Sequence, residues 1–123
     1  MKKLNKKPWG KEEVIYDKEG VQIKILTINK GEMTSLHYHK HKEEVITAIN
    51  DCEVIVGDNT QKFFAGNMIL FHPGKVHAFK ATDKTAIITE TSYGNSEDLI
   101  RLEDKYERVR KPGRPKKQST PGN

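Results

Sequence analysis

The residues best suited to chemistry are histidines and acids gathered in two short segments. All the histidines of the 123-residue chain lie within residues 31–44 and 66–77, and they are His37, His39, His41, His72 and His77. Imidazole and carboxylate groups are the usual protein ligands of Zn, Mn, Fe, Co and Ni ions. A polar strand and a histidine-bearing turn would explain isolated histidines, but this clustering favours a divalent metal site.

The spacing of these residues selects a ligand set. His37 and His39 are two residues apart, so on a β-strand both side chains leave by the same face. Glu44 follows far enough along for the chain to turn into a neighbouring strand, and His77 ends the second segment. Three imidazoles and one carboxylate would leave one or two positions on the ion open, as in catalytic metal sites.

A second register exists in the same segment. His39 and His41 also form a His-x-His pair, and Glu43 could then replace Glu44. We favour the set that begins at His37 because Gly31 can then form a turn just before the first ligand. In that register His41 is a spare imidazole at the end of the strand.

Short runs of β-forming residues predict the elements that position this set. We expect about nine strands, at residues 13–16, 21–28, 33–39, 45–49, 53–56, 62–64, 68–71, 76–80 and 85–91. Turn residues separate these runs, and Gly57-Asp58-Asn59 in particular predicts a hairpin. With no helix among them, such strands are typical of an all-β antiparallel sandwich or barrel.

A change of pattern after the last strand predicts a short C-terminal helix. Ser96 can act as its N-cap, and the acids that follow suit the N-terminal end of a helix. Leu99, Leu102 and Tyr106 lie at i, i+3 and i+7, which would give an apolar stripe for docking on the barrel.

Length and composition indicate one domain. We expect residues 1–109 to fold, with Trp9 packing the N-terminal arm onto the body, and residues 110–123 to form a disordered tail. No apolar run approaches the ~20 residues of a membrane span, and the basic N-terminus lacks the apolar region of a signal peptide. Cys52 is the single cysteine, so a cytoplasmic protein without disulfides is expected.

The net charge of +5 is concentrated near the C-terminus. Residues 108–117 contain six of the 22 basic residues and no acid, which leaves 16 basic against 17 acidic residues elsewhere. A basic nucleic-acid-binding face on the folded part is therefore not expected. Residues 110–117 resemble an AT-hook through Gly113-Arg114-Pro115 and its basic neighbours, although a solubilising tail has the same composition.

The two histidine segments resemble the paired motifs of the cupin superfamily, G-x5-H-x-H-x4-E and G-x5-P-x-G-x2-H. The first motif is matched in full by Gly31, His37, His39 and Glu44. The second is matched by Gly66, Gly74 and His77, with His72 in the place of the usual proline. The resemblance implies a single-domain jelly-roll barrel, or double-stranded β-helix, that binds a divalent metal ion through His37, His39, Glu44 and His77.

A closer resemblance covers about residues 7–108. It is to the cupin domain of type II mannose-6-phosphate isomerases, often the C-terminal part of mannose-1-phosphate guanylyltransferases. Lys7-Pro8-Trp9-Gly10 resembles their R-P-W-G, residues 35–44 resemble S-L-Q-x-H-x-H-R-x-E, and residues 100–108 resemble their closing I-x-R-x-E-D-x-Y-G-R. The resemblance implies aldose–ketose interconversion of a phosphorylated sugar, linked to nucleotide-sugar and polysaccharide biosynthesis. No guanylyltransferase activity is expected, because the nucleotidyltransferase domain is missing from this sequence.

The same resemblance implies roles for individual residues. In such a reaction the metal polarises oxygens of the sugar while a side chain moves a proton, and the residues proposed to move it are Glu43 and His41. The residues proposed to bind the phosphate are Lys42, Lys75 and Arg101. Two departures matter, since His37 replaces the family's glutamine and Lys42 replaces its arginine, which loses the bidentate fork suited to phosphate.

Other functions fit the same residues. A site of three histidines and one glutamate also permits Fe- or Mn-dependent oxygenase chemistry, which needs a redox-active ion. A non-catalytic sugar-binding module, with the AT-hook-like tail able to reach DNA, is a further alternative. Isolated cupins commonly pair, so we also expect a homodimer, with Leu36 and Tyr38 on the outward face of their strand as part of the contact.

Overall fold

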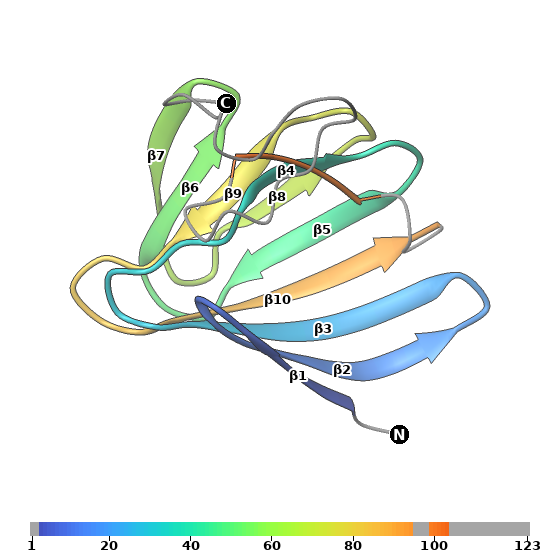
Figure 1. Cartoon of the computed structure of the whole chain (residues 1–123), viewed down its shortest axis with the longest axis horizontal. Coiled ribbons are helices and arrows are strands. Elements are labelled where there is room, and N and C mark those ends of the chain that lie inside the picture. The colour runs from blue at the N-terminus through green and yellow to red at the C-terminus, as the bar shows by residue number, and fades with distance from the viewer. Residues whose placement is uncertain (1–2, 95–98, 104–123) are drawn as a thin grey trace, which may run out of the picture.

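The computed structural model describes residues 3–94 and 99–103, which form two antiparallel sheets facing each other (Figure 1). The six-stranded sheet has the order β1 (Lys3–Lys7), β2 (Gly10–Lys18), β3 (Val21–Ile28), β10 (Ala86–Tyr93), β5 (Glu43–Ala48) and β8 (Met68–Phe71). The five-stranded sheet has the order β11 (Leu99–Glu103), β4 (Leu36–His39), β9 (His77–Lys80), β6 (Cys52–Val56) and β7 (Asn59–Phe63). The prediction of an all-β barrel is confirmed.

Every strand predicted from the sequence is present, with ends that differ by a few residues. The predicted hairpin joins β6 to β7, where Val56 pairs with Asn59 and Gly57 adopts a φ of 60°. The N-terminal arm was not predicted to be a strand, but β1 pairs along its whole length with β2. Trp9 lies in the turn between β1 and β2 and is buried in the core, as expected.

The predicted C-terminal helix is wrong where the structure describes it. Leu99–Glu103 forms β11, which pairs antiparallel with β4 and places Arg101 opposite His37 in the ladder. Without β11, one side of β4 would present unpaired backbone N–H and C=O groups, and a strand pairs them where a helix cannot. The proposed N-cap Ser96, Tyr106 and the tail 110–123 lie outside the described residues.

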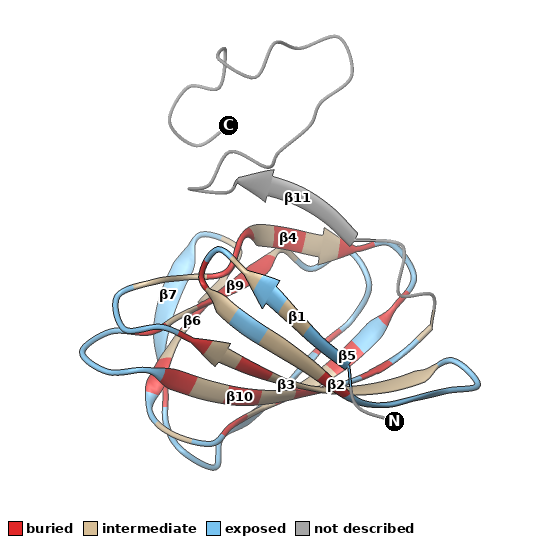
Figure 2. Ribbon diagram, turned by 60° about the horizontal axis from the view of Figure 1, so that its bottom comes forward, coloured by how far each residue is buried: buried red, intermediate tan, exposed pale blue. Residues whose placement is uncertain are grey.

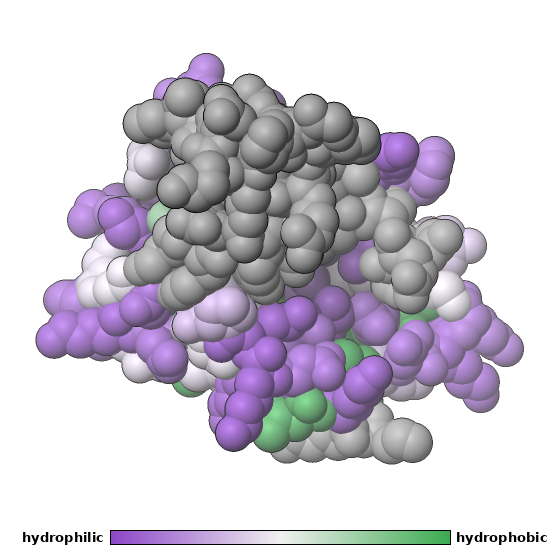
Figure 3. Space-filling model, in the orientation of Figure 1, coloured by the Kyte–Doolittle hydropathy of each residue, from purple (hydrophilic) through white to green (hydrophobic). Residues whose placement is uncertain are grey.

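The core lies between the two sheets. Along β5 and β10, and in the last part of β3, buried residues alternate with more exposed ones, as the period of a strand requires (Figure 2). The largest fully buried apolar side chains are Phe79, Ile28, Ile46, Ile88 and Val54. By contrast, the coloured part of the surface in Figure 3 is mainly hydrophilic, with hydrophobic side chains in small patches. Among the described residues, no helix has the length and hydropathy needed to cross a membrane.

The interior changes character along the strands. On the inward face of β10, Ala86 and Ile88 are followed by Glu90 and Ser92, and all four are buried. Because β5 runs antiparallel to β10, the same direction along the sheet passes from the buried Ala48 and Ile46 to the buried Glu44. One end of the barrel interior is therefore apolar, and the other end holds buried polar and charged groups.

Two phenylalanines test the position of the core. Phe79 is 1% exposed between the sheets, whereas Phe64 is 53% exposed. We expect Phe79→Ala to lower the free energy of unfolding by about 3–5 kcal/mol, because it leaves a cavity between the sheets. Phe64→Ala should change it by less than ~0.5 kcal/mol. Urea denaturation followed by Trp9 fluorescence measures both, and similar losses for the two variants would contradict this assignment of the core.

Candidate metal centre

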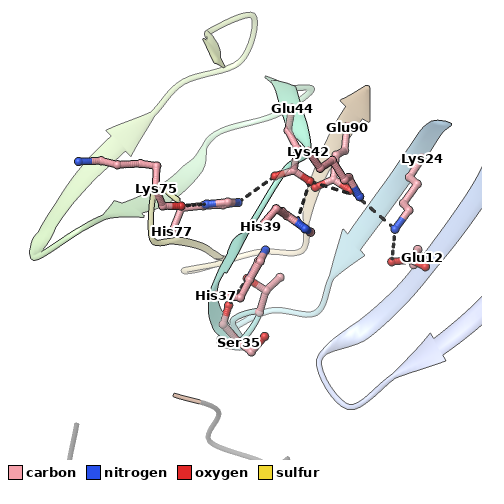
Figure 4. A network of polar contacts seen from close by, with 11 residues as sticks. Glu12, Lys24, Ser35, His37, His39, Lys42, Glu44, Lys75, His77 and Glu90 are labelled. Atoms are coloured by element: carbon pink, nitrogen blue, oxygen red, sulfur yellow. Dashed lines mark hydrogen bonds and ion pairs between the residues drawn. The ribbon is translucent and has the colours of Figure 1, made fainter. Parts of the chain in front are cut away.

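The polar end of the barrel brings three predicted metal ligands together. His37 on β4, Glu44 on β5 and His77 on β9 each offer one ligand atom, and these atoms lie within 4.8 Å of one another (Figure 4). His37 is paired with His77 across the β4–β9 ladder, and Glu44 reaches them from the opposite sheet. All three side chains are buried. The two sheets must therefore face each other for the cluster to form.

The fourth predicted ligand, His39, lies beside Glu44. Its Nε2 atom is 3.2 Å from Glu44 Oε2, while His77 Nε2 is 3.0 Å from Glu44 Oε1. The two imidazoles thus flank the carboxylate, one at each oxygen. The ligand atoms of the other three residues lie within 4.8 Å of one another, and His39 is buried next to them in contact with Glu44.

Backbone carbonyls orient two of the imidazoles. His37 Nδ1 lies 2.7 Å from the carbonyl oxygen of Ser35, and His77 Nδ1 lies 2.8 Å from that of Lys75. A carbonyl can only accept, so each Nδ1 carries a proton and each Nε2 is the ring nitrogen left to face other groups. For His77, Nε2 faces Glu44 Oε1 at 3.0 Å. A proton or a metal ion between the two atoms would make this contact favourable.

The protonation states suit metal binding. Burial lowers the pKa of His37 to about 3, with the nearby His77 acting in the same direction, so His37 is neutral near pH 7. Burial acts to raise the pKa of Glu44, but the neighbouring His39, His77 and Glu90 side chains outweigh it and hold the pKa well below its ordinary range. A neutral imidazole and an ionised carboxylate are the forms that ligate metals.

One atom of the site is left without a hydrogen bond. Glu44 Oε2 is buried and accepts no well-directed hydrogen bond from the described residues, although His39 Nε2 is at 3.2 Å and Lys42 Nζ at 3.8 Å. An unsatisfied buried carboxylate oxygen is costly, and a divalent cation would satisfy it. The residues therefore fit a metal ion, and their nitrogen and oxygen donors suit Zn, Mn, Fe, Co or Ni without selecting one.

A buried network of charges surrounds Glu44 and extends toward β2 (Figure 4). Lys24 Nζ lies 3.2 Å from Glu12 Oε1 and 3.9 Å from Glu90 Oε1. Burial, together with the negative charge of Glu44, raises the pKa of Glu90 well above its ordinary value. Lys42, which is only 2% exposed, approaches Glu44 as described above.

Sequence reasoning missed Glu12, Lys24 and Glu90. The signal was present, because Lys24 shares its strand face with the core residue Leu26, and Glu90 shares its face with Ile88. A charged residue on a face that is otherwise apolar indicates a buried polar site.

The remaining predicted residues are more scattered. Lys75 is exposed, its amine points away from the cluster in Figure 4, and it supports His77 only through its carbonyl. His41 and Glu43 are also exposed, and Glu43 Oε2 lies 3.0 Å from His72 Nδ1. The alternative ligand set of His39, His41 and Glu43 is therefore not assembled. For Arg101, the structure describes the backbone position on β11 and not the side chain.

A family model described as mannose-6-phosphate isomerase C-terminal matches residues 1–104. The chain belongs to this family. Among its relatives, the mannose-1-phosphate guanylyltransferase ManC of Salmonella typhimurium is 28% identical over 108 residues, which is 84% of this chain and 22% of ManC. The mannose-1-phosphate guanylyltransferase of Escherichia coli is 27% identical over 108 residues, or 84% of this chain and 23% of the relative. The chain thus spans less than a quarter of these relatives.

Solved structures confirm the predicted cupin fold. An RmlC-like cupin from Shewanella frigidimarina is similar with a TM-score of 0.70 and 18% identity, over 79% of this chain and 87% of that one. The capsular polysaccharide assembling protein CapF from Staphylococcus aureus gives a TM-score of 0.69 and 13% identity, over 85% of this chain and 35% of CapF. At such identities these likenesses show the fold alone.

Two histidines of this family member give a matched test of the metal centre. We expect His77→Ala to weaken binding of Zn²⁺ or Mn²⁺ at least ~100-fold. Loss of a residue that only hydrogen-bonds to a metal ligand typically weakens binding about 10–100-fold, and this substitution removes a proposed ligand itself. His72→Ala should leave the affinity unchanged, since His72 is exposed and pairs with Glu43 outside the cluster. Competition with a chromophoric chelator measures both affinities. Equal effects of the two substitutions would remove this site from consideration.

The metal-free protein should lose stability as the pH falls. Unfolded His37 takes up a proton below its ordinary pKa of 6.5, whereas folded His37 does so only near 3. The unfolded state therefore binds more protons in this window, and the free energy of unfolding should fall by about 1 kcal/mol per pH unit from this residue. Urea denaturation in EDTA from pH 7 to pH 4 should show a shallower slope for His37→Gln than for His72→Gln. Identical slopes would contradict the buried, neutral state of His37.

Proposed function

We propose that this protein is a metal-dependent isomerase that interconverts the aldose and ketose forms of a phosphorylated sugar. The observation that carries the proposal is the convergence of His37, Glu44 and His77 beside the buried cation of Lys42. This arrangement combines an ion-binding donor set with a fixed positive charge. The names of the relatives, mannose-1-phosphate guanylyltransferases and the xanthan biosynthesis protein XanB of Xanthomonas campestris, support mannose 6-phosphate as the first substrate to test and polysaccharide biosynthesis as the setting.

The buried charges suit an anionic substrate. Glu12 is ionised, since Lys24 and Lys7 hold its pKa below the ordinary value despite burial, which acts to raise it. The charges of Glu12 and Glu44 therefore balance those of Lys24 and Lys42. A divalent ion would leave this end of the barrel positively charged, which favours a phosphate group and the negative charge that develops on sugar oxygens during isomerisation.

Each part of the site has a distinct role in this proposal. His37, Glu44 and His77 would hold the ion, with His39 beside them, and the bound ion would supply polarisation of the sugar carbonyl. Lys42 is the buried residue proposed to attract the phosphate. Lys75 and Arg101 also stay proposed phosphate-binding residues. His41 and Glu43 stay the proposed proton carriers of the reaction, and in this structure both face solvent. A cytoplasmic location also stays a prediction.

A coupled assay on mannose 6-phosphate tests the proposal. We expect formation of fructose 6-phosphate with at least one of Mn²⁺, Zn²⁺, Co²⁺, Ni²⁺ or Fe²⁺, abolished by EDTA and restored by the metal. His77→Ala should lower kcat/KM at least ~100-fold, because it removes a proposed ligand of the ion that would stabilise the transition state. His72→Ala is the matched control and should retain activity.

Additional measurements distinguish the isomerase from the alternative functions. Unphosphorylated mannose should be a poorer substrate than mannose 6-phosphate, and Lys42→Met should reduce the difference between the two sugars. A protein that binds one metal ion per chain but turns over neither sugar with any metal would refute the isomerase proposal. Oxygen consumption with Fe²⁺, or sugar binding without turnover, would then identify an oxygenase or a binding module.

A further inference from the structure

A cavity of about 470 Å³ opens at the edge of the barrel where β8 ends the six-stranded sheet. It is lined by Val56 at the end of β6, by residues 69–71 of β8 and by residues 72–75 of the loop that follows. Because β6 and β8 belong to opposite sheets, the cavity reaches from one sheet to the other. Small-molecule sites measure ~300–1,000 Å³, so this cavity is large enough for a ligand. We call it the side pocket.

The side pocket is separate from the metal centre, since none of the proposed metal ligands lines it. The two are neighbours through Phe71, which lines the pocket and also stacks on the imidazole of His77. The ring centroids of Phe71 and His77 are 4.0 Å apart, and the rings are inclined by 9°. A ligand in the side pocket would therefore contact Phe71 rather than the ion.

Main-chain hydrogen bonds fix the loop wall of the side pocket. The N–H of Gly74 donates to the carbonyl of His39 at 2.7 Å, and the N–H of Gly57 donates to the carbonyl of Val76 at 2.9 Å. These bonds tie the loop to β4 and to the turn between β6 and β7. The pocket is thus formed without a ligand, which lowers the entropic cost of binding one.

Most of the lining is apolar. Five of the eight lining residues are hydrophobic, and they are Val56, Ile69, Leu70, Phe71 and Pro73. Leu70 is 50% exposed, so a ligand packed against it would remove apolar surface from water. Hydroxyl groups would find few partners here, and burying an unpaired hydroxyl is costly. The side pocket therefore suits a compact apolar body and not the sugar phosphate of the proposed function.

The charge at the side pocket is positive. Lys75, which the family resemblance predicts to bind phosphate, lines the pocket, and its amine points away from the metal cluster (Figure 4). Within the described part of the chain, that amine takes part in no hydrogen bond or ion pair. His72 also lines the pocket but is paired with Glu43, and no aspartate or glutamate is among the lining residues. An anionic group would meet an available ammonium here, whereas the basic segment 108–117 of the same chain would be repelled.

We propose that the side pocket binds a small organic anion, with its apolar body against Leu70 and Phe71 and its carboxylate or phosphate group at Lys75. An exposed ion pair contributes little affinity, so the apolar body supplies most of the binding and Lys75 supplies the preference for an anion. The site goes beyond the proposed isomerase function, because it needs neither the metal ion nor a sugar.

Titrations of the isotope-labelled full chain in EDTA, followed by amide chemical shifts, test the proposal without a metal ion that could bind an anion. The probes are 2-naphthoate, 2-naphthyl phosphate and the neutral 2-naphthamide. We expect both anions to bind with dissociation constants below ~1 mM, and the amide to bind about 2–5-fold more weakly, as one exposed ion pair predicts. The shifted signals should include those of Leu70 and Gly74. Mannose 6-phosphate should bind at these residues at least ~10-fold more weakly than 2-naphthoate.

Three variants test the apolar body and the charge separately. Lys75→Met should weaken 2-naphthoate about 2–5-fold and leave 2-naphthamide unchanged. Lys84→Met removes an exposed lysine outside the side pocket and should change neither affinity. Leu70→Glu should weaken both anions at least ~10-fold, because it places a carboxylate on the apolar wall. Its far-ultraviolet circular dichroism should match that of the wild type, since Leu70 is half exposed.

Several results would overturn the proposal. These are an absence of saturable 2-naphthoate binding, shifts confined to residues away from the side pocket, or equal effects of Lys75→Met and Lys84→Met. Binding of mannose 6-phosphate at the same residues as tightly as 2-naphthoate would do so too. None of these measurements uses turnover, so the failure of this site and the failure of the isomerase proposal are distinguishable.

Discussion

The ionised carboxylate of Glu44, buried between the two sheets, is the interaction on which the site depends. Taking such a charge out of water is costly, and the structure offsets the cost with groups from three other strands and a loop: His39, His77, Glu90 and Lys42. His39 and His77 belong to the opposite sheet and are close to Glu44 only because the two sheets face each other, whereas Glu90 lies on the neighbouring strand β10 and Lys42 is two residues away in sequence. The arrangement of the site and the pairing of the sheets are therefore one structural requirement.

The division of the interior into two ends resolves a conflict between stability and function. Buried histidines, lysines and glutamates contribute little to folding and would oppose it if any partner were missing. The apolar end, where Phe79, Ile28 and Ile88 are completely enclosed, supplies the hydrophobic stabilisation. Because β5, β9 and β10 each run through both ends, the apolar half of a strand holds its polar half in register.

Most of the fold and part of the site could be predicted from the sequence. Alternating runs and turn residues found the strands, because those signals are local and the barrel agrees with them. The His-x-His spacing and the family resemblance selected His37, Glu44 and His77, which the structure brings together as a candidate metal site. The helix over 99–103 was wrong because the need of β4 for a backbone partner is a long-range effect that no local pattern reports. Glu90 and Lys24 were missed for a related reason, since their importance comes from charges brought close by other strands.

The hydrogen bonds that orient His37 and His77 share a feature with a wider consequence. In each case the acceptor is the main-chain carbonyl two residues earlier, at Ser35 and at Lys75. Every amino acid, proline included, has such a carbonyl, so no particular side chain is needed to aim these imidazoles. Each ring is therefore oriented by the main chain that leads into its own strand. Position 75, whose side chain is exposed, is thus free to vary while the ring orientation of His77 is kept, whereas the buried Ser35 can be replaced only by a side chain that fits its packing.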